Sequence, residues 1–320
     1  MTEQAAPLPA AEAADLADRV VASLATAVHA PIETLRLPLL TLLAEGHVLV
    51  EDVPGVGKTM LAKALARSLD LSFARVQFTP DLLPADVTGV NVFDQASGAF
   101  RFRPGPVFGN VVLVDEINRA SPKTQSALLE AMQEAQVTVD GTTHALERPF
   151  LVIATQNPVE YEGTYPLPEA QLDRFAVRMA IGYPPLVEEA RMLAEQTTEP
   201  PLDHLRPVAG REEVLAAIDA VRSVYVEESV NRYAVALLRH TRANARLALG
   251  ASPRAGISLL RLAKATAVVE RRDFVTPEDI RAVASVVLSH RILLAPEARS
   301  TGVSPQDVIS EAIDGTPVPV

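Results

Sequence analysis

The sequence predicts an α/β domain with a parallel sheet, a P-loop and two hairpin inserts, followed by a smaller all-helical domain. Short β-branched runs alternate with helical patterns as far as Gly182, which is typical of a parallel sheet covered by helices. A glycine loop that ends in Lys58 joins the first predicted strand to a helix. Beyond Gly182 the pattern becomes one of amphipathic helices, and we expect no strands there.

Each element follows from its local pattern. Apolar, β-branched runs predict strands at 47–50, 73–78, 111–114, 150–155 and 176–180, with helices at 59–69 and 122–134. Asp140-Gly141 is a tight-turn signal and predicts a hairpin over 136–146. A second hairpin over 91–103 would turn near residues 96–98 and return with aromatic residues on one face and arginines on the other: Phe100, Phe102, Arg101 and Arg103.

The Gly-Tyr-Pro-Pro run at 182–185 marks the boundary between the two domains. We therefore expect an α/β domain at 11–182 and a helical domain at 183–314. The Ala- and Pro-rich ends, 1–10 and 315–320, are predicted to be disordered tails. In the second domain, hydroxyl residues precede prolines at Ser252, Thr276 and Ser304, so helices should begin there.

Composition excludes several classes of function. The net charge of −11 argues against a general nucleic-acid-binding surface, although local basic patches remain open. No cysteine is present, which rules out disulfides and thiolate metal sites, and the six histidines lack metal-ligand spacing. The sequence has no secretory signal and no apolar run that could span a bilayer, so we expect a cytoplasmic protein with no membrane span.

The segment HVLVEDVPGVGKTMLAK at 47–63 has the strand, loop and helix order of a P-loop. Gly55 and Gly57 let consecutive amides point at phosphate oxygens, and Lys58 adds a charge at the β- and γ-phosphates of ATP. Asp52 stands where the first glycine of the strict pattern belongs, so its carboxylate must face away from the phosphates. The predicted nucleotide-binding residues are Pro54, Gly55, Val56, Gly57, Lys58, Thr59 and Met60.

Two carboxylates, Asp115 and Glu116, end the apolar run at 111–114, at the strand edge where ligands bind in open α/β sheets. Asp115 and the hydroxyl of Thr59 would hold Mg²⁺, and Glu116 would polarise the attacking water. The alternative is that the acids only cap the helix that begins after Ser121. A third strand ends in Asn157, whose amide can reach the water or the γ-phosphate, although Asn before Pro is also ordinary turn chemistry.

Together these residues resemble the AAA+ ATPases, and longer phrases resemble their MoxR family. The set comprises the GKT of the P-loop, Asp115-Glu116, Asn157 and LDRF at 172–175. The MoxR-like phrases are QFTPDLLPADVTG at 77–89, DEINRA at 115–120, YEGTYPLPEAQLDRF at 161–175 and GASPRA at 250–255. The resemblance covers roughly residues 15–313 and implies that the helical domain is a lid.

By resemblance, Asn157 is the sensor 1 residue, Arg174 the arginine finger and Arg254 the sensor 2 arginine of the lid. A planar guanidinium can stabilise the charge that spreads over the γ-phosphoryl group. Arg254 would bring lid charge to the same nucleotide as the P-loop. Spacing alone leaves a surface ion pair equally open for either arginine, and Arg119 and Arg178 compete for the finger role.

The resemblance also implies a head-to-tail ring, typically a hexamer, because the finger acts on the neighbour's nucleotide. It implies chaperone-like remodelling or maturation of a client protein or enzyme complex, with a partner that carries a von Willebrand factor A domain. Phe100 and Phe102 could grip the client, although such aromatics are more often packed. Two other functions stay open: a nucleic-acid motor that uses Arg101 and Arg103, and a nucleotide-gated scaffold with little turnover.

Overall fold

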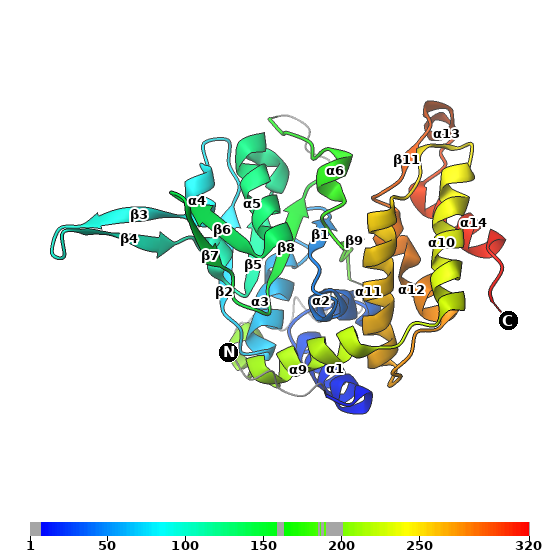
Figure 1. Ribbon diagram of the computed structural model, residues 1–320, viewed down its shortest axis with the longest axis horizontal. Coiled ribbons are helices and arrows are strands. Elements are labelled where there is room, and N and C mark those ends of the chain that lie inside the picture. The colour runs from blue at the N-terminus through cyan, green and yellow to red at the C-terminus, as the bar shows by residue number, and fades with distance from the viewer. Residues whose placement is uncertain (1–7, 159–162, 185, 187–188, 190–200, 320) are drawn as a thin grey trace.

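The computed structural model describes residues 8–158, 163–184, 186, 189 and 201–319. At its centre is a five-stranded, all-parallel sheet in the order β2-β5-β8-β1-β9 (Figure 1). The predicted strands are confirmed to within two residues at each end. Their bounds are β1 Val48–Glu51, β2 Phe73–Gln77, β5 Val111–Asp115, β8 Leu151–Gln156 and β9 Val177–Met179.

Both faces of the sheet are buried, as the uninterrupted apolar strands require. Alternate side chains point to opposite faces, so Val111 and Leu113 lie in one core while Val112 and Val114 lie in the other. The first core includes α1 Ala10–Ala25, α2 Ile32–Leu43 and α3 Lys58–Ser68, and the second includes α4 Pro84–Thr88, η1 Pro106–Phe108, η2 Ile117–Arg119 and α5 Pro122–Glu134.

Both predicted hairpins are confirmed: β3 Gly89–Asp94 with β4 Ala99–Pro104, and β6 Gln136–Val139 with β7 Thr142–Ala145. The β3–β4 hairpin projects far from the sheet (Figure 1). Its aromatic residues divide into two groups. Phe102 stacks on His144 with ring centroids 3.9 Å apart, whereas Phe100 is 72% exposed and contacts only Phe93 edge to face among the described aromatic rings.

The second part of the chain forms a helical lid, as predicted. Its three predicted helix starts are confirmed at Pro253, Pro277 and Pro305. The expectation that it holds no strands is wrong, because β10 Leu247–Leu249 and β11 Leu293–Leu294 form a short antiparallel pair. The helices are α8 Pro201–His204, α9 Arg211–Ser223, α10 Glu228–Ala243, α11 Pro253–Val269, α12 Pro277–Leu288, α13 Pro296–Ser300 and α14 Pro305–Gly315, with the short α6 Glu169–Leu172 before β9.

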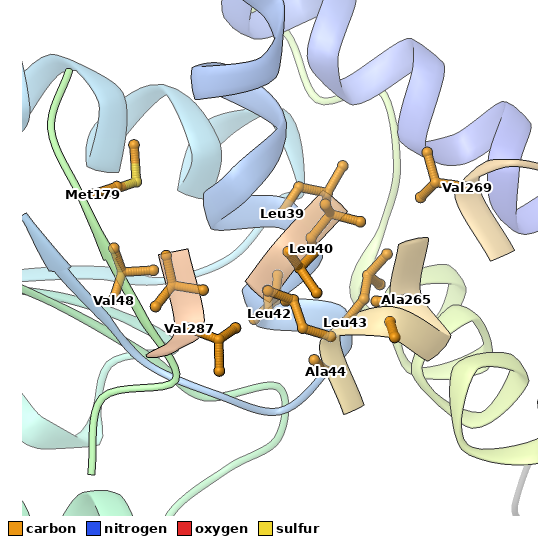
Figure 2. Close-up of a cluster of buried hydrophobic side chains, with 14 of the residues drawn as sticks. Leu39, Leu40, Leu42, Leu43, Ala44, Val48, Met179, Ala265, Val269 and Val287 are labelled. Carbon is orange, nitrogen blue, oxygen red and sulfur yellow. The ribbon is translucent and has the colours of Figure 1, made fainter. Parts of the chain in front are cut away.

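The lid and the sheet share one apolar core. Figure 2 shows α2 side chains such as Leu39 and Leu43 among residues of the lid helices, including Ala265 and Val287. Val48 of β1 belongs to the same buried cluster. Because this core is continuous, packing against α2 fixes where the lid sits relative to the sheet.

The predicted tails are only partly described. Residues 1–7 and residue 320 lie outside the described residues, and α1 already begins at Ala10. At the other end, α14 includes Gly315, and the buried Thr316 donates a hydrogen bond to the Ala312 carbonyl. Gly315 and Thr316 thus belong to ordered structure. Within the described residues, no helix has the length and apolar character needed to cross a membrane.

His47 precedes β1 and is buried between two backbone groups. The Val152 amide donates to its Nδ1 at 3.0 Å, so the ring proton lies on Nε2, which donates to the Met132 carbonyl at 3.0 Å. Burial lowers the pKa of His47 to about 4, and the Met132 contact only partly offsets this. The imidazole is therefore neutral in the folded protein at pH 7.

We expect this buried histidine to make the protein acid-sensitive. Between pH 6.5 and about 4, the unfolded chain binds a proton at residue 47 that the folded chain does not bind. The contribution to the free energy of unfolding is complete above pH 6.5, and about 3 kcal/mol of it is lost as the pH falls to 4. Urea titrations at pH 7 and pH 4.5 should show a smaller loss in His47→Gln than in the wild type, and an unchanged loss in the exposed control His204→Gln. Equal losses in all three proteins would contradict this origin.

Candidate functional site

The loop between β1 and α3 has the backbone that a phosphate cradle needs. Gly55 and Gly57 adopt φ angles of +87° and +93°, which side-chain-bearing residues rarely adopt. Apart from the chain neighbours, no atom lies within 4 Å of a Cβ built on either glycine, so the space beside both residues is open. Val56 and Met60 pack against the core, which leaves the loop backbone and the free amides of the first turn of α3 to meet an anion.

Lys58 begins α3 and points back across the loop. Its Nζ donates to the Asp52 carbonyl at 2.6 Å. Burial lowers the pKa of Lys58, while the charges of Asp52, Asp115 and Glu116 act in the opposite direction. Lys58 therefore lies within electrostatic reach of both acids, on the same edge of the sheet.

Asp52 departs from the strict P-loop pattern, and its carboxylate does face away from the cradle. Oδ2 accepts hydrogen bonds from the amides of Ile181 at 2.8 Å and Gly182 at 2.7 Å, and Oδ1 accepts one from the Val53 amide. The buried acid thus ties the start of the loop to the segment after β9. This contact explains why a carboxylate is tolerated where the pattern has glycine.

Asp115 ends β5 and is buried. Arg75 of β2 donates from Nε to its Oδ2 at 2.7 Å, and the Thr155 hydroxyl donates to its Oδ1 at 3.3 Å. These contacts fix the carboxylate at the carboxyl edge of the sheet, with β8 between its strand and β1, which leads into the P-loop.

Glu116 follows in a left-handed conformation, with φ of +56°. Such a backbone is unusual for glutamate and commonly occurs at functional sites. Its amide donates to the Thr155 hydroxyl at 3.0 Å, and its Oε2 forms an ion pair with Nε of Arg119 at 2.7 Å. The side chain is 37% exposed, so it can exchange this partner for water.

Thr155 and Arg75 were not identified from the sequence as parts of the site. Thr155 contacts both acids, since its hydroxyl accepts from the Glu116 amide and donates to Asp115. The sequence does contain a signal for Thr155, because it is a single hydroxyl residue at the end of the apolar run 150–155. Arg75 gave none, because its contact with Asp115 depends on the pairing of β2 with β5.

We expect Thr155→Val to lower the free energy of unfolding by about 1–3 kcal/mol, because a buried amide and a buried carboxylate lose a partner. Valine preserves the shape of threonine, so the loss isolates the hydroxyl. Thermal and urea unfolding measure the effect, with the exposed hairpin change Thr143→Val as the matched control. A Thr155→Val protein as stable as the control would show that the hydroxyl does not hold the two acids.

Asn157 lies one residue beyond the carboxyl end of β8, and β8 lies between β1 and β5 in the sheet. Carboxyl ends of neighbouring parallel strands meet at one edge, so Asn157 is on the same side as Lys58 and the acids. The predicted cluster of P-loop, acidic pair and asparagine thus follows from the strand order.

Arg174 and Arg254 lie elsewhere. Both line a cavity of about 140 Å³ that also includes His47, at the amino end of β1. The P-loop begins at the opposite, carboxyl end of that strand, about 13 Å away over its four residues. In this structure Arg254 therefore lies away from the chain's own P-loop. Arg254 lies there because α11 of the lid packs near the amino edge of the sheet.

The two arginines that compete with Arg174 for the finger role both form ion pairs within the chain. Arg119 pairs with Glu116, and Arg178 of β9 pairs with Glu51 of β1 at 3.2 Å. Among the described residues, the side chain of Arg174 forms neither an ion pair nor a hydrogen bond. Arg174 is thus the arginine of these three that points into a cavity without a partner.

The residues at the carboxyl edge fit Mg²⁺ only together with a nucleotide. No group of three or more His, Cys, Asp or Glu side chains in the described part of the chain could hold a metal ion alone. P-loop proteins need no such group, because one hydroxyl, one carboxylate, water and phosphate oxygens complete the shell. Thr59, the second residue of α3, and Asp115 supply that donor set.

Comparisons with known proteins agree with this geometry. Residues 47–177 match the ATPase family associated with various cellular activities (AAA), and residues 239–312 match the AAA lid domain. The chain is 51% identical to the uncharacterized protein YeaC of Bacillus subtilis, over 89% of each chain. It is 40% identical to Chaperone MoxR1 of Mycobacterium tuberculosis, over 88% of this chain and 76% of that one. A crystal structure from Cytophaga hutchinsonii superposes with a TM-score of 0.91 at 39% identity, covering 98% of this chain and 97% of that one.

Proposed function

The chain belongs to the MoxR family of AAA+ ATPases, and from this premise we propose that it hydrolyses Mg²⁺-ATP to drive chaperone-like remodelling or maturation of client proteins. The observation that carries the proposal is the meeting of Lys58, Asp115 and Glu116 at one edge of the sheet. An open amide cradle beside them supplies the place for a triphosphate.

In this mechanism, each residue at the carboxyl edge has one role. The amides from Gly55 to Thr59 bind phosphate oxygens, and Lys58 leaves the Asp52 carbonyl to contact the β- and γ-phosphates. Glu116 leaves Arg119 and orients the attacking water, whose proton it accepts. Asn157 positions the same water or the γ-phosphate. Bound Mg²⁺, held through Thr59 and Asp115, would neutralise charge on the phosphates.

Arg174 and Arg254 would complete the site of a neighbouring subunit. Both lie at the edge of the sheet opposite to the chain's own P-loop, so a head-to-tail contact between copies would bring them to the next nucleotide. Such a contact closes into a ring when the rotation permits, and we propose a hexamer. There the two guanidinium groups stabilise charge on the transferred phosphoryl group.

The proposal that the protein acts on client polypeptides rests on the β3–β4 hairpin and on the chaperone name of the mycobacterial relative. Phe93 and Phe100 place two exposed aromatic rings near the tip of a projecting hairpin, where they could grip a polypeptide (Figure 1). A partner with a von Willebrand factor A domain is proposed from the family resemblance. The nucleic-acid alternative is weakened because Arg101 already pairs with Asp94 at 3.1 Å.

Lys58→Ala tests the proposal. It removes a charge-assisted contact with the triphosphate, so ATP should bind about 10- to 100-fold more weakly and phosphate release should fall below detection. Lys63→Ala is the matched control, because Lys63 lies on the same helix but over the Phe73 ring, away from the loop. Titration with a fluorescent ATP analogue and a phosphate-release assay measure both effects. Equal activity in the two variants would refute the proposal.

A further inference from the structure

Arg291, just beyond α12 in the lid, is buried against the segment that carries Arg174. Its side chain is 1% exposed, and its Nε forms an ion pair with Asp173 Oδ1 at 2.7 Å. Its other two nitrogens donate to the carbonyls of Asp173, Phe175, Ala176 and Val287, and to the Ser258 hydroxyl, at 2.6–3.2 Å. One lid side chain thus bonds the residues on both sides of Arg174.

Two further lid residues hold the same segment. His290 Nε2 donates to the Phe175 carbonyl at 2.9 Å, and the Ser252 hydroxyl contacts Asp173 Oδ2 at 3.4 Å. Burial lowers the pKa of His290 well below its usual value, and the adjacent Arg291 charge acts in the same direction. His290 therefore stays neutral and adds no charge to the guanidinium beside it.

The same contacts fix Arg254. Ser252 caps α11, Arg254 lies in its first turn, and Ser258 lies one turn further along. Ser252 and Ser258 both form hydrogen bonds with the clamp formed by Arg291 and Asp173, and Ser258 lines the same cavity as Arg174 and Arg254. The spacing between Arg174 and Arg254 is thus set by bonds between the lid and the 173–176 segment.

We propose that Arg291, supported by His290, is a positioning residue that fastens the arginine finger to the lid, so that Arg174 and Arg254 move as one unit. This inference rests on the proposed action of Arg174 on the neighbour's nucleotide. Any shift of the lid then moves both guanidinium groups relative to the neighbour's γ-phosphate. A buried arginine is a costly way to gain stability, since apolar residues of similar volume often do as well, but its fixed fork specifies orientation.

The expected signature separates positioning from general stability. Arg291→Ala should lower kcat for ATP by about 10²-fold, because a small displacement of a catalytic group has effects of this size. Binding of ATP should not change, because each subunit keeps its own P-loop. Adding Arg291→Ala to Arg174→Ala should cause no further loss of kcat, because both changes remove the same function.

Mixing experiments then locate the defect. Arg291→Ala subunits keep an intact P-loop, and Lys58→Ala subunits keep an intact finger. Mixed rings of the two should regain activity above the sum of the parents. Mixing Arg291→Ala with Arg174→Ala should give no gain, since both lack a well-placed finger. A loss of kcat that Lys58→Ala subunits do not rescue would overturn the inference.

Controls cover misfolding and the premise itself. Asp173→Asn and Arg291→Lys alter the same clamp more gently, and each should give a smaller loss with the same rescue. Arg272→Ala breaks another lid ion pair, with Asp279, which is remote from the finger, so it should lower stability without changing kcat. If Arg174→Ala itself keeps full activity, the assignment of Arg174 as the finger fails, and the positioning role of Arg291 fails with it, whereas ATP hydrolysis is tested separately by Lys58→Ala. If Arg174→Ala loses activity but Arg291→Ala does not, the positioning role of Arg291 is refuted and the finger assignment stands.

Discussion

Glu116→Gln is expected to bind ATP as tightly as the wild type but to hydrolyse it about 10²- to 10⁴-fold more slowly. Glutamine keeps the size of the side chain and loses the basic oxygen that accepts the proton of the attacking water. Glu116 suits this role because it follows Asp115 in a left-handed backbone conformation, and its ion pair with Arg119 is accessible to solvent. Single-turnover hydrolysis and ATP binding, measured separately, distinguish the two effects.

The matched control is Glu228→Gln, which removes a carboxylate from an exposed ion pair with Arg232 on α10. It should leave both binding and turnover unchanged. If Glu116→Gln turned over ATP at the control rate, another group would have to activate the water. If it lost ATP binding as well, Glu116 would act on the ground state rather than on the chemical step.

Arg174→Ala is expected to lower kcat by about 10³- to 10⁵-fold, the usual value of an arginine finger. Binding of ATP to each subunit's own P-loop should persist, because Arg174 lies at the opposite edge of the sheet. Mixing with Lys58→Ala subunits should restore activity, since a complete site then forms at some interfaces. Arg178→Ala gives the comparison, because Arg178 is held by Glu51 within its own subunit. A larger loss for Arg178→Ala would transfer the finger role to that residue.

Local patterns predicted most of the fold. Apolar runs located all five strands of the central sheet, and a hydroxyl before proline located the starts of α11, α12 and α14. The P-loop and the acids could be placed together because the carboxyl ends of parallel strands share an edge. The strands β10 and β11 were missed, since elements of three and two residues carry too little pattern.

Contacts between distant parts of the chain could not be predicted. Asp52 is satisfied by amides 129 and 130 residues away, and Arg75 reaches Asp115 only because β2 pairs with β5. The position of Arg254 depends on how α2 packs against the lid, and sequence spacing contains no information about that packing.

We propose above that each ATPase site is shared between two copies of the chain. The most direct measurement is an experimental structure of Glu116→Gln assembled with Mg²⁺ and ATP. We expect a triphosphate on the Gly55–Thr59 amides, with its γ-phosphate contacting Lys58 of the same chain and the guanidinium groups of Arg174 and Arg254 from the neighbour. A γ-phosphate contacted by Arg254 of its own chain, or a triphosphate bound away from the loop, would contradict it.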